Sequence, residues 1–120
     1  MNARSLIGIA VLAGLSAVGA CSARRGEPLI GSVPAGDTRV DRGRIAFMQH
    51  CHKCHPNGEA GLAPGINDKP LPEFLMKTQV RVGLGAMPSF SREQISDEQL
   101  DDLIRYLKAL RGMRTQTHKM

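Results

Sequence analysis

Two cysteines and a histidine stand close together in the stretch MQHCHKCHPNG, residues 48–58, where their types and spacing are suited to chemistry. Cys51 and Cys54 have two residues between them, and His55 follows the second cysteine directly. Thiols and imidazoles can bind a metal ion, thiols can pair as a disulfide, and both can hold a haem. The surrounding sequence discriminates among these three possibilities.

A structural zinc site and a redox disulfide are both disfavoured. Structural zinc takes four ligands, typically from two separated pairs, whereas this chain has one cysteine pair, with His50 and His52 too close to Cys51 to close a tetrahedron and His118 far away. A thioredoxin-like Cys-x-x-Cys belongs to an α/β fold and opens a helix after a strand. Here the pair follows a predicted helix, and turn-forming residues come after it.

The third possibility is a covalently attached haem. Cys-x-x-Cys-His is the attachment signature of c-type haem. Two thiols at this spacing add to the two vinyl groups on one edge of the porphyrin, and the next residue then lies beneath the ring, within reach of the iron. We therefore predict one covalent haem c, with Cys51 and Cys54 as its attachment points and His55 as an axial iron ligand. A haem would also enlarge the core of a small domain with 3% aromatic residues and no Trp.

The N-terminus has the features of an export signal. Arg4 precedes an uncharged run from Leu6 to Ala20, which fits a signal-peptide core and is short for a membrane span. The sequence VGAC, ending at Cys21, resembles the lipobox of bacterial lipoproteins, in which the cysteine is acylated. We expect a signal peptide over residues 1–20 and a lipid on Cys21, which places the protein on the periplasmic side of a bacterial membrane. Ordinary cleavage before Cys21 and a retained membrane helix are the alternatives.

The remaining sequence predicts helices and no strand of any length. Apolar residues three or four positions apart predict helices from Val40 to about His50, from Pro72 to about Gly83, and from Ser96 to Arg111. Asp37 or Thr38 is expected to cap the first helix, and Ser96 with Gln99 forms a capping box for the last one. The second helix has Phe74, Leu75 and Val82 as its apolar positions, and the last has a core stripe of Leu100, Leu103, Ile104, Leu107 and Leu110.

These elements divide the chain into four parts. Residues 1–20 are the signal peptide, and residues 21–38, rich in Gly, Pro and Ser, are a lipid-anchored flexible tether. Residues 39–112 are an all-α haem domain, and residues 113–120 are a basic tail. The formal net charge of +5 is mild and does not suggest a nucleic-acid partner.

The motifs and their order resemble those of the class I c-type cytochromes over about residues 38–111. A first helix carries GRIAF and ends in CHKCH, and the last helix carries LIRYL. In that family the glycine of the first pattern, here Gly43, lies where the two helices cross, and the aromatic residue four positions later is here Phe47. The resemblance implies a small cytochrome c fold, with three or four helices around a single haem.

Two loops extend the resemblance to the surroundings of the iron. The loop GLAPGIN resembles the segment whose proline carbonyl accepts a hydrogen bond from the iron-binding histidine, which implies that Pro64 orients His55. The segment VRVGLGAMPSF resembles the loop that carries the sixth ligand, which implies Met87. Met87 lies in a glycine-rich loop 32 residues after His55, so the chain can wrap around the haem. His118 is its rival. The expected haem surroundings are Phe47, Phe90, Leu62, Ile66, Val82, Leu103 and Leu107.

The resemblance implies one-electron transfer without catalysis, because an iron with His and Met ligands has no open position for a substrate. Its partners would be redox proteins, such as a dehydrogenase, an oxidase or another cytochrome, and the chain would be a monomer or a subunit. A fixed cytochrome subunit of a larger oxidoreductase is the first alternative. A haem-based sensor or peroxide enzyme, with a labile Met87, is the second.

Overall fold

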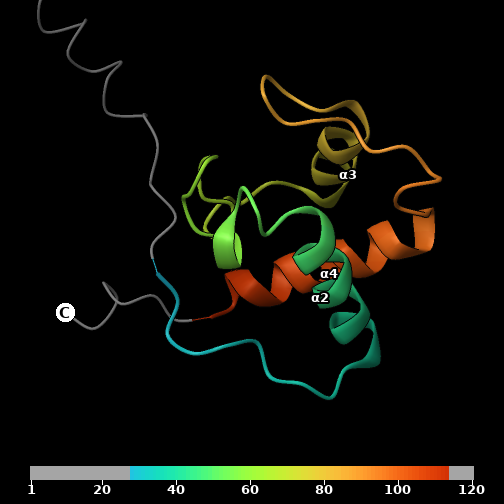
Figure 1. Ribbon diagram of the computed structural model, residues 1–120. Helices are drawn as coiled ribbons and strands as arrows, with labels where there is room; N and C mark the ends of the chain where they lie inside the picture. Colours follow the sequence, from blue (N-terminus) through green and yellow to red (C-terminus); the bar gives the residue numbers. More distant parts are fainter. Residues whose placement is uncertain (1–27, 114–120) are drawn as a thin grey trace, which may run out of the picture.

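The computed structural model describes residues 28–113, and all regular secondary structure in this part of the chain is helical (Figure 1). The helices are α2 (Thr38–His50), a short 3-10 helix η2 (Pro56–Gly58), α3 (Glu73–Val82) and α4 (Asp97–Arg111). The prediction of an all-α fold is confirmed. The predicted signal peptide, the acylated Cys21, the rival ligand His118 and all but the first residue of the predicted tail lie outside the described residues.

The helix ends follow the capping residues that the sequence supplies. The side chain of Asp37 accepts hydrogen bonds from the backbone N–H groups of Arg39 and Val40 at the start of α2. Ser96 and Gln99 form both hydrogen bonds of a capping box at the start of α4. Each cap satisfies backbone donors that have no partner within the helix. The predicted boundaries of these two helices are therefore confirmed to within about two residues.

Helices α2 and α4 cross near the middle of the molecule, and α3 lies on the other side of α4 (Figure 1). At the crossing the backbone of Gly43 is so close to α4 that a Cβ atom there would overlap the carbonyl oxygen of Asp102 and lie 2.9 Å from the Cβ of Tyr106. One turn later Phe47, which is fully buried, packs its ring 5.3 Å from the ring of Tyr106. Gly43 thus allows the two helices to approach closely, and the rings of Phe47 and Tyr106 pack between them one turn later.

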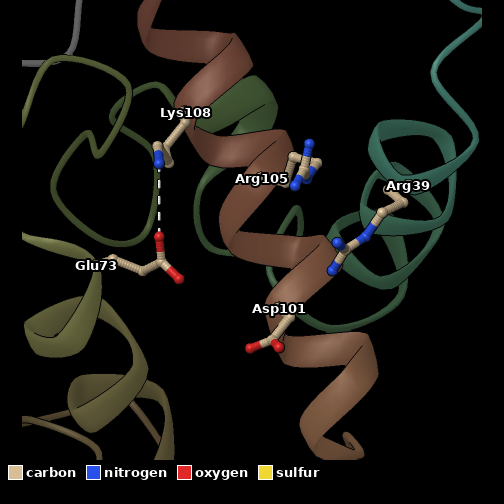
Figure 2. Close-up of a pocket in the computed structure, with 5 residues that line it drawn as sticks. All are labelled: Arg39, Glu73, Asp101, Arg105 and Lys108. Atoms are coloured by element: carbon tan, nitrogen blue, oxygen red, sulfur yellow. Dashed lines mark hydrogen bonds and ion pairs between the residues drawn. The ribbon is translucent and has the colours of Figure 1, made fainter.

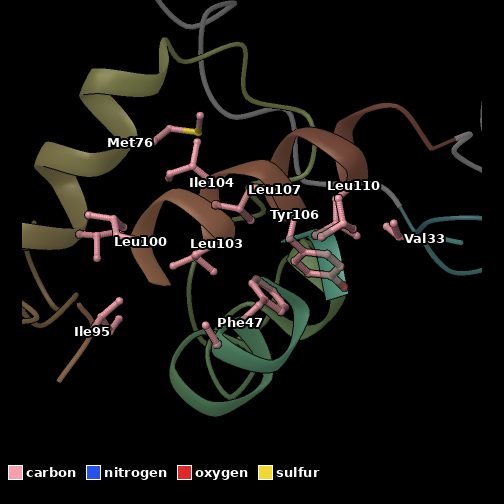
Figure 3. Close-up of a cluster of buried hydrophobic side chains, with 13 residues drawn as sticks. Val33, Phe47, Met76, Ile95, Leu100, Leu103, Ile104, Tyr106, Leu107 and Leu110 are labelled. Carbon is pink, nitrogen blue, oxygen red and sulfur yellow. The ribbon is translucent and has the colours of Figure 1, made fainter. Parts of the chain in front are cut away.

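The hydrophobic core lies between the three long helices (Figure 3). All five residues of the stripe predicted on α4 are buried, which confirms that stripe. The core consists of Val33, Val40, Ala46, Phe47, Met76, Val80, Ile95, Leu100, Leu103, Ile104, Tyr106, Leu107 and Leu110.

The buried face of α3 differs from the prediction. Phe74, Leu75 and Val82, its expected apolar positions, are 65%, 42% and 71% exposed. The residues that this helix buries are Met76 and Val80, which are four positions apart and so share one face. Phe74, Leu75 and Val82 leave an apolar surface on the outside of the helix.

Ion pairs to α4 accompany this orientation of α3. Lys77 Nζ lies 2.8 Å from Asp101 Oδ1, and Arg81 Nη2 lies 2.8 Å from Asp97 Oδ1. Lys77 directly follows the buried Met76, and Arg81 directly follows the buried Val80. When these two basic side chains face α4, the side of α3 that carries Met76 and Val80 therefore faces the core. The pairing depends on residues from two separate helices, which periodicity within one helix does not reveal.

The first described residues are packed on the domain, whereas the sequence predicts a flexible tether as far as residue 38. Val33 is 5% exposed and belongs to the core. Its carbonyl oxygen accepts a hydrogen bond of 2.6 Å from Arg44 Nη2, and the N–H of Leu29 donates to Glu59 Oε1 at 3.0 Å. The domain therefore begins before residue 39. Among the described residues, no helix has the length and apolar character needed to cross a membrane.

Asp102 is a carboxylate buried at the crossing of α2 and α4. Its side chain is 2% exposed, and its two oxygens each accept a hydrogen bond of 2.7 Å, Oδ1 from Arg39 Nε and Oδ2 from Arg42 Nε. Burial alone would raise the pKa of Asp102, but the two hydrogen bonds outweigh it and lower the pKa below its usual value. Asp102 is therefore ionised, and it links α4 to the start of α2.

We expect Asp102→Asn to reduce the free energy of unfolding by about 2 kcal/mol at pH 7, because an NH₂ group would replace one of the two oxygens that accept from Arg39 and Arg42, and it cannot accept. The pKa of Asp102 is lower in the folded protein than in the unfolded chain, so its contribution is complete above about pH 4 and is lost as the pH falls through the folded value. Urea denaturation should show the difference between the two proteins shrinking in acid. The matched control is Asp101→Asn, at a carboxylate whose side chain is 49% exposed. An equal loss in both variants would contradict this account.

Candidate functional site

The Cys-x-x-Cys-His motif forms a compact turn at the end of α2. The N–H of Cys51 donates to the carbonyl of Phe47 at 2.8 Å, which continues the helix by one step. The N–H groups of Cys54 and His55 then both donate back to the carbonyl of Cys51, at 3.1 and 2.9 Å. The two thiols are not joined by a disulfide. The backbone therefore presents two free thiols and an imidazole from a single turn.

The loop after the motif positions the His55 ring. The N–H of Ala63 donates to the carbonyl of Cys54 at 3.1 Å, which folds this loop back over the motif. The Nδ1 atom of His55 lies 2.8 Å from the carbonyl oxygen of Pro64. Because a carbonyl can only accept, this contact requires the proton on Nδ1 and leaves Nε2 with its lone pair for a metal. Such a contact also restricts the rotation of the ring.

Met87 is carried by a tight loop after α3. Leu84 and Met87 form two backbone hydrogen bonds with each other, of 3.2 and 3.0 Å. Gly83 has a φ of 77°, and a Cβ atom there would lie 2.6 Å from the carbonyl oxygen of Met87. The N–H of Phe90 donates to the carbonyl of Val80 at 2.9 Å and closes the loop onto α3. The loop therefore requires a glycine at residue 83, and its ends are held by backbone bonds.

A single cleft between α2, α3 and α4 brings three of the predicted site residues together. Cys51, His55 and Met87 all line it. Cys54 and Pro64 are not part of its lining, although Pro64 contacts His55 from outside. The remaining residues that line the cleft are Ile66, Lys69, Leu71, Met76, Gln79, Val80, Leu103, Leu107 and Arg111.

The chemistry of this cleft fits a haem better than a zinc ion. Its lining is mainly apolar, as a flat apolar cofactor requires. No group of three or more His, Cys, Asp or Glu side chains in the described part of the chain is arranged to hold a metal ion. Burial, with a smaller contribution from Cys54, raises the pKa of the Cys51 thiol to about 12. The thiol is therefore protonated at neutral pH when nothing is bound to it.

The residues predicted to surround the haem lie only in part along this cleft. Ile66, Leu103 and Leu107 line the cleft. Leu62 and Val82 do not, and they are 82% and 71% exposed. Leu62 lies in an irregular loop, where no periodicity indicates which way a side chain points.

The two predicted phenylalanines lie close to the cleft without lining it. Phe47 is fully buried against Tyr106 in the core, and Phe90 packs with its ring 5.7 Å from the ring of His50. Met76 and Val80 also line the cleft, and the sequence analysis did not place them near the haem, although their spacing of four puts them on one face of α3. Arg111 lines it too, and no local sequence pattern indicates this.

A second hollow in the structure has a different character. It lies between the three long helices and is lined by charged side chains alone (Figure 2). Lys108 Nζ lies 3.5 Å from Glu73 Oε2 across it. This hollow has no thiol, imidazole or thioether, so it is separate from the candidate haem site. Its lining residues are Arg39, Glu73, Asp101, Arg105 and Lys108.

Known proteins similar to this chain are cytochromes. Residues 38–107 match the family model described as cytochrome C oxidase, cbb3-type, subunit III. The 4-cresol dehydrogenase (hydroxylating) cytochrome c subunit of Pseudomonas putida is 34% identical over 82 residues, which cover 65% of this chain and 72% of that protein. Cytochrome c6 of Gloeothece citriformis (strain PCC 7424) is 33% identical over 88 residues, covering 65% of this chain and 77% of that protein. No solved structure gives a significant match.

Proposed function

Because this chain belongs to the class I c-type cytochromes, we propose that it carries single electrons through one haem c whose iron is bound by His55 and Met87. Proteins of this family hold haem c covalently and act as electron carriers. The observation that supports the specific assignment is the cleft that Cys51, His55 and Met87 line together. Cys51 and Cys54 are the attachment points of the haem.

Each of these residues has a defined task. The bound haem supplies an iron that exchanges one electron between its ferric and ferrous states. His55 is held by the carbonyl of Pro64 with Nε2 available to the iron. Met87 would supply a thioether ligand to the iron, and such a ligand favours the ferrous state relative to a second nitrogen ligand. The cleft has few polar side chains, so its surroundings should need little rearrangement when the charge on the iron changes.

A redox titration of the holoprotein, made with haem maturation, tests this function. We expect one reversible one-electron transition for each haem, with a low-spin iron in both oxidation states. Carbon monoxide should leave the reduced spectrum unchanged. A reduced protein that binds carbon monoxide readily would instead support the sensor or peroxide enzyme.

A fixed subunit of a larger oxidoreductase is the second candidate. It is favoured by the similarity to a protein named as the cytochrome c subunit of a dehydrogenase. Purification from the native membrane under mild conditions separates the two candidates. A stoichiometric flavoprotein or other oxidoreductase that co-purifies would support a subunit, and a cytochrome that purifies alone would support a shuttle.

We propose that the protein is exported and anchored on the periplasmic side of a bacterial membrane by a lipid on Cys21. Cys21→Ala should then move the haem protein from the membrane fraction to the soluble periplasmic fraction, because one thioether-linked lipid and its acyl chains supply the attachment. Fractionation with haem staining measures this. Wild-type protein in the soluble fraction would indicate ordinary cleavage, and a Cys21→Ala variant that stays in the membrane would indicate a retained helix.

A further inference from the structure

Arg111, the last residue of α4, faces the cleft with a guanidinium that has only neutral partners among the described residues. Nη1 donates to the carbonyl oxygen of Leu71 at 3.1 Å, and Nη2 lies 2.7 Å from the sulfur of Met76. The Nε atom is buried and makes no hydrogen bond. A carbonyl and a thioether compensate a buried cation poorly. Burial accordingly lowers the pKa of Arg111.

Other arginines of this domain are arranged differently. Arg39 and Arg42 each donate to a carboxylate oxygen of Asp102 at 2.7 Å, and Arg81 donates to Asp97 at 2.8 Å. The fork of a guanidinium matches a carboxylate in geometry and charge, which makes this the usual pairing. Arg111 has the same fork, but its buried Nε–H has no partner and it lines a cleft without an acidic residue.

The cleft is lined by basic side chains and by no acidic ones. Lys69 lines it together with Arg111, and no Asp or Glu is among its lining residues. Lys69 pairs with Asp68 at 3.0 Å, and Asp68 lies outside the lining. An apolar cleft with cations at its border fits a body that is apolar over most of its surface and carries acidic groups at one edge. Haem is such a body, because its porphyrin ring bears two propionate carboxylates.

We propose that Arg111 binds a propionate carboxylate of the haem, with its unpaired Nε–H as one of the donors. This proposal rests on the proposed function, since it takes the cleft as the haem site. The pairing keeps that propionate ionised at neutral pH and cancels its negative charge near the iron. Arg111 is therefore a positioning residue that holds the haem by its acidic edge, while the thioethers hold the opposite edge.

The test compares Arg111→Gln with Arg105→Gln. Arg105 is on the same helix, is exposed, and lies in the charged hollow instead of the haem cleft. Both variants lose one positive charge, so a general charge effect appears equally in both. In Arg111→Gln the bare propionate should stabilise the ferric state. The ferrous-to-ferric ratio at a fixed electrode potential should fall about fivefold at pH 8.

The dependence of the midpoint potential on pH gives a second readout. In Arg111→Gln the potential should rise as the pH is lowered from 8 to 5, because protonation of the released propionate removes its negative charge. In the wild type and in Arg105→Gln the rise should be smaller over the same range, because only the propionate that Arg111 does not bind can titrate. Equal potentials and equal pH profiles in the two variants would overturn the proposal, and circular dichroism with a haem assay checks that both are folded and loaded.

A measurement on the wild type decides the matter if Arg111→Gln yields no holoprotein. With haem labelled by ¹³C at the propionate carboxyl carbons, we expect one carboxyl resonance to show no titration between pH 5 and 8. Two resonances that both titrate in this range would overturn the proposal. Failure of the proposed function would be seen separately, because the wild type would then contain no covalent haem or would bind carbon monoxide in its reduced state.

Discussion

Replacing Met87 with alanine should lower the midpoint potential of the haem, by an amount on the order of 100 mV, and open its iron to carbon monoxide. Loss of the thioether removes a ligand that favours the ferrous state and leaves one axial position to water or to an added ligand. Redox titration measures the first effect. The absorption spectrum of the reduced protein with and without carbon monoxide measures the second.

The matched control for Met87→Ala is Met76→Leu. Met76 lines the same cleft but is 7% exposed and packed in the core. A leucine of similar volume should keep the packing, with a cost below about 1.5 kcal/mol, and leave the iron closed. The opposite result would be a Met76→Leu protein that binds carbon monoxide and a Met87→Ala protein with the wild-type spectrum. It would mean that Met76, and not Met87, is the sixth ligand.

Gly43→Ala should be the most destabilising small substitution in the domain, with a loss of about 3 kcal/mol in the free energy of unfolding. The new Cβ atom would overlap the carbonyl oxygen of Asp102 and lie 2.6 Å from its carbonyl carbon. Both are backbone atoms of α4, so the helices must move apart to relieve the overlap. Alanine gains about 1 kcal/mol in helix propensity, which offsets only part of this cost.

Gly112→Ala is the control for the same change. Gly112 has a φ of −74°, and a Cβ atom there would meet nothing closer than 3.4 Å, an ordinary contact. Urea denaturation of the two variants should therefore separate the effect of the helix crossing from that of losing a glycine. A Gly43→Ala protein as stable as Gly112→Ala would mean that α2 and α4 do not cross as closely as described.

The helix caps, the buried stripe of α4 and the Cys-x-x-Cys-His turn could be predicted from the sequence, because each depends on residues that are close together in the chain. The caps of α2 and α4 depend on side chains within three residues of the helix start, and the buried stripe of α4 depends on its own period. The Cys-x-x-Cys-His motif is contained in one turn of backbone, so its spacing already implies its chemistry. The contact between His55 and Pro64 spans nine residues, and only the resemblance to a family suggested it.

Features that depend on distant residues were not predictable in this way. Asp102 is buried although it is charged, because two arginines about 60 residues earlier reach it. The face that α3 turns toward α4 carries Lys77 and Arg81, which pair with carboxylates of α4. Arg111 reads as an ordinary basic residue at a helix C-terminus, and only the position of Leu71 and Met76 turns it toward the cleft.

X-ray absorption at the iron edge of the wild-type holoprotein tests the central claim most directly, because it reports the atoms bound to the iron. We expect one sulfur atom among the nearest neighbours of the iron, in both oxidation states, with nitrogen at the other positions. That sulfur should be absent in Met87→Ala. Nitrogen neighbours alone, or a position filled by oxygen from water, would contradict ligation by His55 and Met87 and the closed electron carrier derived from it.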